Sequence, residues 1–171
     1  MIEADPAQAA IVAKLDELAR SLRRWRRRRN GLVALLSRAE PAPKGLYIFG
    51  SVGRGKTMLM DMFFAACPQD AKRRVHFHAF MQDVHERIHA HRQAFKRGEN
   101  KEEDPVAPVA RQLAKEARLL CFDEFHVLDI ADAMILSRLF KVLLEEGVVL
   151  VATSNVDPGD LYHNGLNREL F

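Results

Sequence analysis

The sequence predicts an α/β fold in which a parallel sheet is flanked by helices and preceded by an N-terminal helical segment. Three short apolar runs, at residues 46–49, 119–122 and 148–152, have the length and composition of strands buried on both faces. Segments with apolar residues at helical spacing separate these runs, and strands that alternate with helices favour a parallel sheet. We expect a fourth strand at residues 75–80, where apolar residues alternate with histidines.

The first 30 residues have the pattern of a long amphipathic helix. An Asp-Pro pair at its start supplies an N-cap and a first-turn proline, and an Asn-Gly pair at its end supplies a C-cap. Two prolines near residue 42 then form a stiff connector into the first strand. We therefore divide the chain into an N-terminal helical segment, residues 1–44, and an α/β core, residues 45–171. The apolar positions of the helix are Ile11, Leu15, Leu18, Leu22 and Trp25.

Seven arginines cluster within residues 20–29 and leave the rest of the chain mildly acidic, although the net charge is +3. Such a patch could face nucleic acid, acidic lipid or an acidic protein surface. A helix dipole also favours arginines near the helix C-terminus, and we prefer this interpretation of a solvated helix end. The patch consists of Arg20, Arg23, Arg24, Arg26, Arg27, Arg28 and Arg29.

The glycine-rich segment after residues 46–49 matches the phosphate-binding pattern G-x-x-x-x-G-K-[ST] without a gap. Glycines let successive backbone N–H groups close around phosphate oxygens, and the following helix adds the positive end of its dipole. Lys56 would reach the β- and γ-phosphates of a nucleotide, and the Thr57 hydroxyl would bind Mg²⁺. The alternative, a chance glycine-rich turn, is disfavoured by the complete motif. Its residues are Gly50, Ser51, Val52, Gly53, Arg54, Gly55, Lys56 and Thr57.

Polar residues follow the two later apolar strands directly. Asp123 would lie near the magnesium ion at the tip of one strand, and Glu124 would orient or deprotonate an attacking water. Asn155 follows the other strand, at the edge of a doubly wound sheet where ligands bind, and we predict that it senses the γ-phosphate. The alternative is an ordinary turn amide in front of Asp157.

A competing motif lies in the predicted helix after residues 75–80. His85, Glu86 and His89 match the H-E-x-x-H pattern of zinc metalloproteases, with two histidines as ligands and the glutamate as base. A catalytic zinc site needs a third protein ligand. His91 points to another side of the helix, and the glutamates of the acidic segment 98–104 lie in a loop that we expect to be flexible and have no evident reason to return. We therefore prefer a partly solvated helix flank.

The length, composition and cysteine content indicate the number of domains and the kind of cellular compartment. A chain of 171 residues with 48% hydrophobic and 29% charged residues predicts one globular domain with a substantial core. Cys67 and Cys121 stand in apolar surroundings and indicate buried thiols in a reducing compartment. No apolar run approaches the length of a membrane span, and Glu3 and Asp5 are unlike the start of a signal peptide. We expect a cytoplasmic protein without a transmembrane segment.

Together these segments resemble the AAA+ ATPases related to the bacterial cell-division protein ZapE and its mitochondrial relatives. The resemblance rests on GLYIFGSVGRGKTMLMDMFF, VHFHAFM, LLCFDEFHVLDIADAMIL and ATSNVDPGDLYHNGLNRELF, and covers nearly the whole chain. It implies hydrolysis of ATP with Mg²⁺, coupled to a protein client that in bacteria would belong to the division machinery. The resemblance also implies a homo-oligomer joined through the ATP site. It further implies a strand order in which the strand that leads to Asn155 lies between the strand that precedes the loop of Lys56 and the strand that ends at Asp123.

The resemblance raises two expectations about the end of the chain. Such ATPases carry a fifth strand and a small helical lid, and the sequence ends at Phe171 before both, so we expect a truncated chain that turns over ATP poorly. Arg168 is a candidate arginine finger that would act on the ATP of a neighbouring subunit, and the alternative is a surface arginine near a chain end. His126 departs from what is expected in many relatives.

Three functions therefore stay open on the sequence. The first is an ATPase that acts on a protein client, as the resemblance implies. The second is a related P-loop protein that loads or remodels nucleic acid through the arginine patch. The third is a zinc hydrolase built on His85 and His89.

Overall fold

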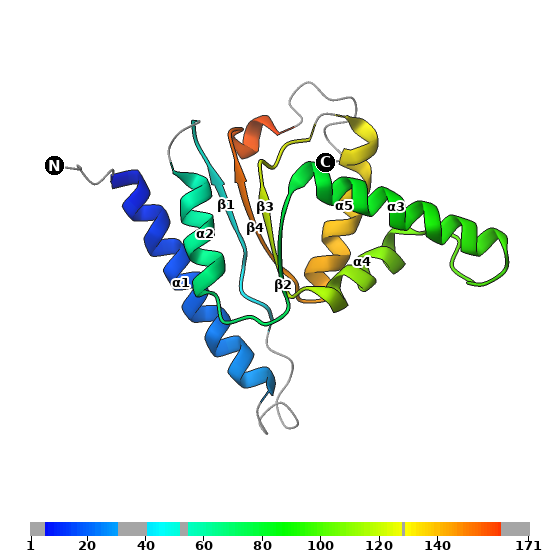
Figure 1. The fold of residues 1–171 in the computed structure, drawn as a ribbon, viewed down its shortest axis with the longest axis horizontal. Coiled ribbons are helices and arrows are strands. Elements are labelled where there is room, and N and C mark those ends of the chain that lie inside the picture. The colour runs from blue at the N-terminus through cyan, green and yellow to red at the C-terminus, as the bar shows by residue number, and fades with distance from the viewer. Residues whose placement is uncertain (1–5, 31–40, 52–54, 128, 162–171) are drawn as a thin grey trace.

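The computed structural model describes residues 6–30, 41–51, 55–127 and 129–161, and shows a sheet with helices on both faces (Figure 1). The strands are β1 (Leu46–Phe49), β2 (Lys72–His76), β3 (Leu119–Asp123) and β4 (Val149–Ser154). The helices are α1 (Pro6–Asn30), α2 (Lys56–Ala66), α3 (Phe77–Lys96), α4 (Val106–Glu116) and α5 (Ile130–Glu145), followed by a 3₁₀ turn at Pro158–Asp160. No helix in the described ranges is long and apolar enough to cross a membrane.

The four strands run parallel in the order β1-β4-β3-β2. Phe49 at the end of β1 pairs with Ser154 at the end of β4, and Phe122 near the end of β3 pairs with Ala152. All carboxyl ends therefore meet at one edge of the sheet, which lies at the top of Figure 1. The predicted parallel α/β fold is confirmed, and so is the predicted position of β4 between β1 and β3.

Strands β1, β3 and β4 contribute alternate residues to two separate cores, because successive side chains of a strand point to opposite faces. On β3, Leu119 and Cys121 pack toward α1 and α2, whereas Leu120 and Phe122 pack toward α3, α4 and α5. Cys67 lies in the first of these cores, so both thiols are buried, as predicted. The sheet is thus covered on both faces, as its continuous apolar strands require.

Helix α1 forms as the apolar spacing predicted, with Leu15, Leu18, Leu22 and Trp25 buried against α2 and the sheet. The described arginines of the patch, Arg20, Arg23 and Arg24, are exposed on the opposite side. Although α1 shares a core with α2, the division into residues 1–44 and 45–171 stays a prediction.

The strand predicted at residues 75–80 is wrong in position. Strand β2 spans Lys72–His76, and helix α3 already begins at Phe77. His76 pairs with Asp123, the last residue of β3, so the neighbouring strand offers no further ladder partner. Phe77 and Phe80 are both buried and lie one helical turn apart. The apolar residues of 75–80 therefore fit a helical spacing as well as the strand alternation that was predicted.

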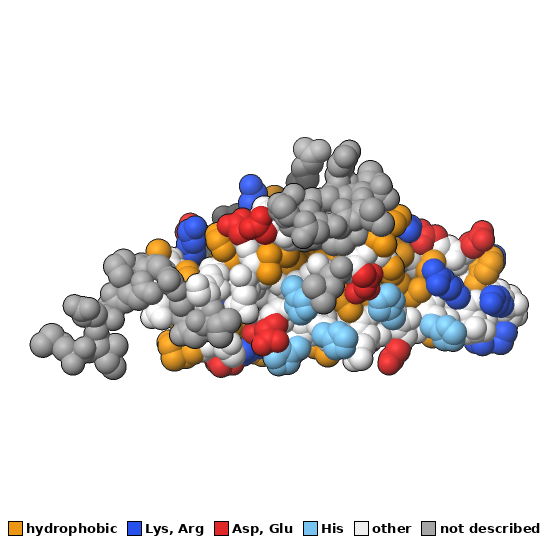
Figure 2. All heavy atoms as spheres, turned by 90° about the horizontal axis from the view of Figure 1, so that it is seen from above, with side chains coloured by type: hydrophobic (Ala, Val, Ile, Leu, Met, Phe, Trp, Pro, Cys, Tyr) orange, Lys and Arg blue, Asp and Glu red, His pale blue; other side chains and the backbone are white. Residues whose placement is uncertain are grey.

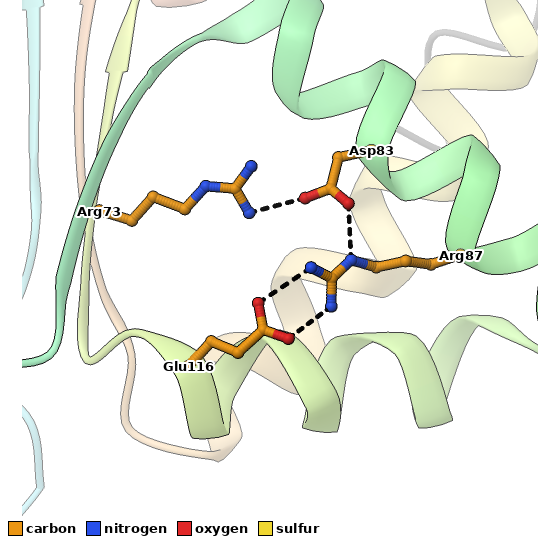
Figure 3. Close-up of polar contacts among 4 residues, drawn as sticks. All are labelled: Arg73, Asp83, Arg87 and Glu116. Atoms are coloured by element: carbon orange, nitrogen blue, oxygen red, sulfur yellow. Dashed lines mark hydrogen bonds and ion pairs between the residues drawn. The ribbon is translucent and has the colours of Figure 1, made fainter.

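An ion-pair network fastens β2 to the helices beside it (Figure 3). Arg73 of β2 donates to Asp83 of α3 at 2.6 Å, and Asp83 also accepts from Arg87 Nε at 2.7 Å. Arg87 in turn donates to both carboxylate oxygens of Glu116 of α4, at 2.6 and 2.9 Å. Burial alone would raise the pKa of Asp83, but hydrogen bonds from Arg87 and Arg73 outweigh burial and hold this pKa below its ordinary value. The Asp83 carboxylate therefore stays ionised at neutral pH.

Candidate nucleotide site at the carboxyl edge of the sheet

The glycine-rich loop begins at the end of β1, beside the end of β4. Its first residue, Gly50, donates its backbone N–H to the carbonyl of Ser154 at 3.3 Å, which anchors the loop beside β4. Gly55 caps α2 in the left-handed conformation, with φ 71°, which a side chain would disfavour. Residues Val52, Gly53 and Arg54 of the predicted loop lie outside the described residues.

Lys56 and Thr57 begin helix α2. The Lys56 ammonium donates to the carbonyls of Gly50 at 2.7 Å and Ser51 at 2.8 Å, so its charge lies against the first two residues of the loop. Thr57 is exposed in the first helical turn. Backbone N–H groups at the start of a helix, together with a lysine, can bind phosphate oxygens.

Asp123 and Glu124 are adjacent in the sequence but differ in burial and in backbone conformation. Asp123 is buried at the end of β3 on the same face as Cys121, which is the face covered by α2. Its Oδ1 lies 3.5 Å from the Thr153 hydroxyl. Glu124 is exposed and has φ 56°, a left-handed conformation that costs a residue with a side chain free energy. The hydrogen bond from Phe125 N–H to the Thr153 carbonyl, at 2.7 Å, helps to hold this strained turn in place.

Ser154 joins the segment around Asn155 to the segment after Glu124. Its hydroxyl donates to the Phe125 carbonyl at 2.6 Å and accepts from the Val156 N–H at 3.1 Å. Asn155 itself is exposed between these bonded neighbours. The sequence reasoning missed Ser154, and its signal was a small polar residue between two others at the end of a buried strand.

Tyr47 of β1 completes this set of contacts. Its hydroxyl donates to the Val156 carbonyl at 2.8 Å, and its ring meets that of Phe125 edge-on with centroids 5.9 Å apart. Burial raises the pKa of Tyr47, so the phenol is a protonated donor at neutral pH. The backbone on both sides of Asn155 is therefore held from β1, β3 and β4 together.

The structure thus brings most of the predicted site residues to one edge. The described loop residues, Asp123, Glu124 and Asn155 all lie at or just beyond the carboxyl ends of β1, β3 and β4. Figure 2 looks onto this edge from above and shows histidine side chains that extend from near the strand ends outward over α3, a grouping that the sequence reasoning did not anticipate. Arg168 lies outside the described residues.

The donor groups of the site suit a magnesium nucleotide. A hydroxyl from Thr57 and a carboxylate from Asp123 are oxygen ligands of the kind that Mg²⁺ prefers, and Mg²⁺ usually takes only one or two protein carboxylates beside substrate phosphates. The lysine and the start of α2 supply positive charge for those phosphates. The residues present therefore fit ATP and Mg²⁺.

The first histidine of the zinc motif has another partner. His85 Nε2 lies 2.7 Å from Asp132 Oδ1 of α5, on the surface. His91 contacts the backbone carbonyl of Glu102 at 2.7 Å, so the acidic loop does return to α3, but through a carbonyl rather than a carboxylate. Across the described part of the chain, no group of three or more His, Cys, Asp or Glu residues could hold a metal ion. The zinc motif thus has no third ligand among these residues.

Comparisons with known proteins agree with this geometry. Residues 1–171 match the family described as AFG1-like ATPase. Over 132 residues the chain is 54% identical to Lactation elevated protein 1 homolog B of Danio rerio, which covers 75% of this chain and 26% of that protein. Over 128 residues it is 48% identical to Cell division protein ZapE of Escherichia coli strain K12, covering 75% of this chain and 32% of that protein. The chain therefore spans only about a third or less of the length of these relatives.

Two solved structures resemble the fold. The structure of DnaI superposes with a TM-score of 0.57 at 16% identity, covering 95% of this chain and 71% of that one. AMPPCP-bound DnaA from Aquifex aeolicus gives a TM-score of 0.51 at 16% identity, covering 99% of this chain and 44% of that one. At this identity the likeness concerns the fold alone, and it confirms the predicted α/β fold.

Proposed function

Because the chain belongs to the AFG1-like ATPase family, we propose that it binds ATP with Mg²⁺ and hydrolyses it to ADP and phosphate at the carboxyl edge of its sheet. One observation carries the proposal: the strand order places β4, which leads into Asn155, between the strand entering the glycine-rich loop and the strand ending at Asp123. Binding groups, an acid and an amide thereby meet at one place.

Binding falls to the loop and to the start of α2. The Lys56 ammonium would move from the loop carbonyls to the β- and γ-phosphates, where opposite charge favours it more strongly. Thr57 and Asp123 would hold Mg²⁺, which when bound neutralises charge on the phosphate oxygens.

Hydrolysis falls to Glu124 and Asn155. A water oxygen forms a bond to the γ-phosphorus while the bond from that phosphorus to the bridging oxygen of ADP breaks, and the water proton passes to the Glu124 carboxylate. The Glu124 side chain is exposed, and Glu124 lies in a turn that is hydrogen-bonded to β4. The backbone of Glu124 is therefore held in place before substrate binds. The Asn155 amide would contact the γ-phosphate or the water from the next strand.

The finer roles follow from the family and from the names of the relatives. We propose a cytoplasmic bacterial protein that forms a homo-oligomer through its ATP sites, with Arg168 reaching the γ-phosphate of a neighbouring subunit. The name of the E. coli relative, a cell division protein, supports a protein client in the division machinery. The nucleic-acid alternative stays a hypothesis that rests on exposed arginines of α1, such as Arg20, Arg23 and Arg24.

A binding and turnover experiment tests the core of the proposal. A fluorescent ATP analogue is titrated into the chain with Mg²⁺, and phosphate release is followed in parallel. Lys56→Ala should abolish measurable binding, because it removes the cation placed against the β- and γ-phosphates. Lys115→Ala, which removes an exposed lysine of α4 far along the chain from the loop, is the matched control and should bind like wild type. Equal affinity of Lys56→Ala and wild type would show that the loop is not the site.

A further inference from the structure

Strand β2 carries two adjacent arginines that face opposite sides of the sheet. Arg73 points toward α3, where it contributes to the network of Figure 3. Arg74 pairs with Cys121 in the ladder and shares its face, which is the face of α2 and of Asp123. One arginine therefore serves the fold between β2 and the helices, while the other lies beside the candidate magnesium ligand.

Arg74 bridges the helix after the loop and the strand that ends in the acid. Its Nε donates to Asp123 Oδ2 at 2.8 Å, and its Nη1 pairs with the carboxylate of Asp61 on α2. The side chains of Arg74 and Asp123 are only 18% and 9% exposed, whereas that of Asp61 is 61% exposed. The pair with Asp123 is thus largely shielded from water, and the pair with Asp61 lies at the surface.

This arrangement gives the buried Asp123 carboxylate a partner and holds it in place. A buried polar group without a hydrogen-bond partner is costly, and the guanidinium supplies that partner. A planar guanidinium that is bonded on two sides has little freedom to rotate, so it also fixes the position of the carboxylate oxygen that it contacts. With Oδ2 bonded to Arg74, Oδ1 is the oxygen left near Thr153.

From this geometry we infer that Arg74 is a positioning residue for magnesium: it holds Asp123 so that one carboxylate oxygen is ready for the ion, and Asp61 holds Arg74. The inference rests on the proposed function of the site. Carboxylates that bind metals are generally held by an outer shell of hydrogen bonds, whose loss costs about 10- to 100-fold in metal affinity or activity. The charge of Arg74 would by itself repel Mg²⁺, and the carboxylate of Asp61 offsets part of that charge.

The test measures the Mg²⁺ concentration that half-saturates binding of a fluorescent ATP analogue, without reference to turnover. Arg74→Gln should raise this concentration about 10- to 100-fold. Arg74→Lys should also raise it, because an ammonium cannot make two bonds in one fixed plane. Asp61→Asn should give a smaller rise, since that pair is exposed. Binding of the analogue in EDTA should be the same in all variants.

Arg73→Gln is the matched control on the neighbouring residue. It breaks the pair with Asp83 on the other face, so it should lower the unfolding temperature but leave the half-saturating Mg²⁺ concentration unchanged. An unchanged or lower half-saturating concentration in Arg74→Gln would overturn the inference, as would an equal rise in Arg73→Gln. If wild type failed to bind the analogue at any Mg²⁺ concentration, the proposed function itself would fall. Should Arg74→Gln not fold, Arg74→Lys supplies the same comparison with the charge retained.

Discussion

The face of the sheet under α3, α4 and α5 is built differently from the face under α1 and α2. The first is closed by large aromatic rings and by the ion pairs of Figure 3. The second is mainly aliphatic, with Met60, two cysteines and only Trp25 and Phe63 as buried aromatic residues among those described, and it carries Asp123 at its upper end. The two faces therefore have different roles. The face under α3, α4 and α5, called here the aromatic face, holds the strands in place, and the face under α1 and α2 carries the charged groups of the site.

The aromatic face reaches the site at one point. The Phe122 ring lies 4.7 Å from that of Phe80 and 5.9 Å from that of Phe140, measured between centroids. Phe125 joins the same cluster, 4.4 Å from Phe77, and it is the residue directly after Glu124. The packing of that face thereby fixes the turn on which Glu124 leaves the sheet.

The largest expected effect comes from removing the central ring of the aromatic face. Phe122→Ala should lower the free energy of unfolding by about 3–5 kcal/mol, because it leaves a cavity at a position with 0% exposure. Cys121 precedes Phe122, points to the other face and is equally buried. Cys121→Ala should lower the free energy of unfolding by only about 1 kcal/mol, since it removes a single sulfur atom. Urea unfolding monitored by circular dichroism measures both. Equal losses would contradict the proposed difference between the faces.

The next effect concerns the strained turn at Glu124. Glu124→Gln should keep nucleotide binding but reduce phosphate release by roughly 10²- to 10⁴-fold, because the amide cannot take the water proton. Glu124→Gly should lose hydrolysis as well, yet raise the free energy of unfolding by about 1 kcal/mol by relieving the left-handed backbone. Phosphate release and thermal unfolding are compared for both variants. A glycine variant less stable than the glutamine variant would mean that the turn stores no strain.

A smaller effect is expected from the ion pairs beside β2. Asp83→Asn should cost about 1.5–3 kcal/mol at pH 7, because its carboxylate accepts hydrogen bonds from two arginines. The pKa of Asp83 is lower in the folded chain than in the unfolded chain, so this stability is present above the unfolded pKa of about 4 and is lost as the pH falls through the folded pKa. Unfolding measured between pH 7 and pH 3 should therefore show the gap between wild type and Asp83→Asn closing in acid. A constant gap would argue against an ionised Asp83 carboxylate.

The smallest effect is expected from the zinc motif. The double change His85→Ala and His89→Ala removes one exposed pair with Asp132 and should cost at most about 1 kcal/mol of stability. Nucleotide affinity and metal content should not change. Elemental analysis decides the matter: one zinc per wild-type chain that is missing from the double variant would restore the metalloprotease hypothesis.

Local patterns predicted much of the fold, and contacts between distant segments account for the rest. The glycine-rich loop and the acids after β3 were found because each is a continuous motif with its own chemistry. Residues 75–80 were misjudged because six residues fit both strand and helix periods, and the end of β3 decides between them. Arg74 and Ser154 went unnoticed because their partners, Asp123 and Phe125, come close only through the strand order.

The hydroxyl of Ser154 gives the site a mechanical property. It is bonded at once to the Phe125 carbonyl and to the Val156 N–H, so a displacement of the backbone on one side of this hydroxyl is transmitted to the other. Glu124 precedes Phe125 and Asn155 precedes Val156, so we expect the backbones of Glu124 and Asn155 to move together rather than independently. Through the Tyr47 hydroxyl on Val156, the same movement is passed to β1, the strand that enters the glycine-rich loop.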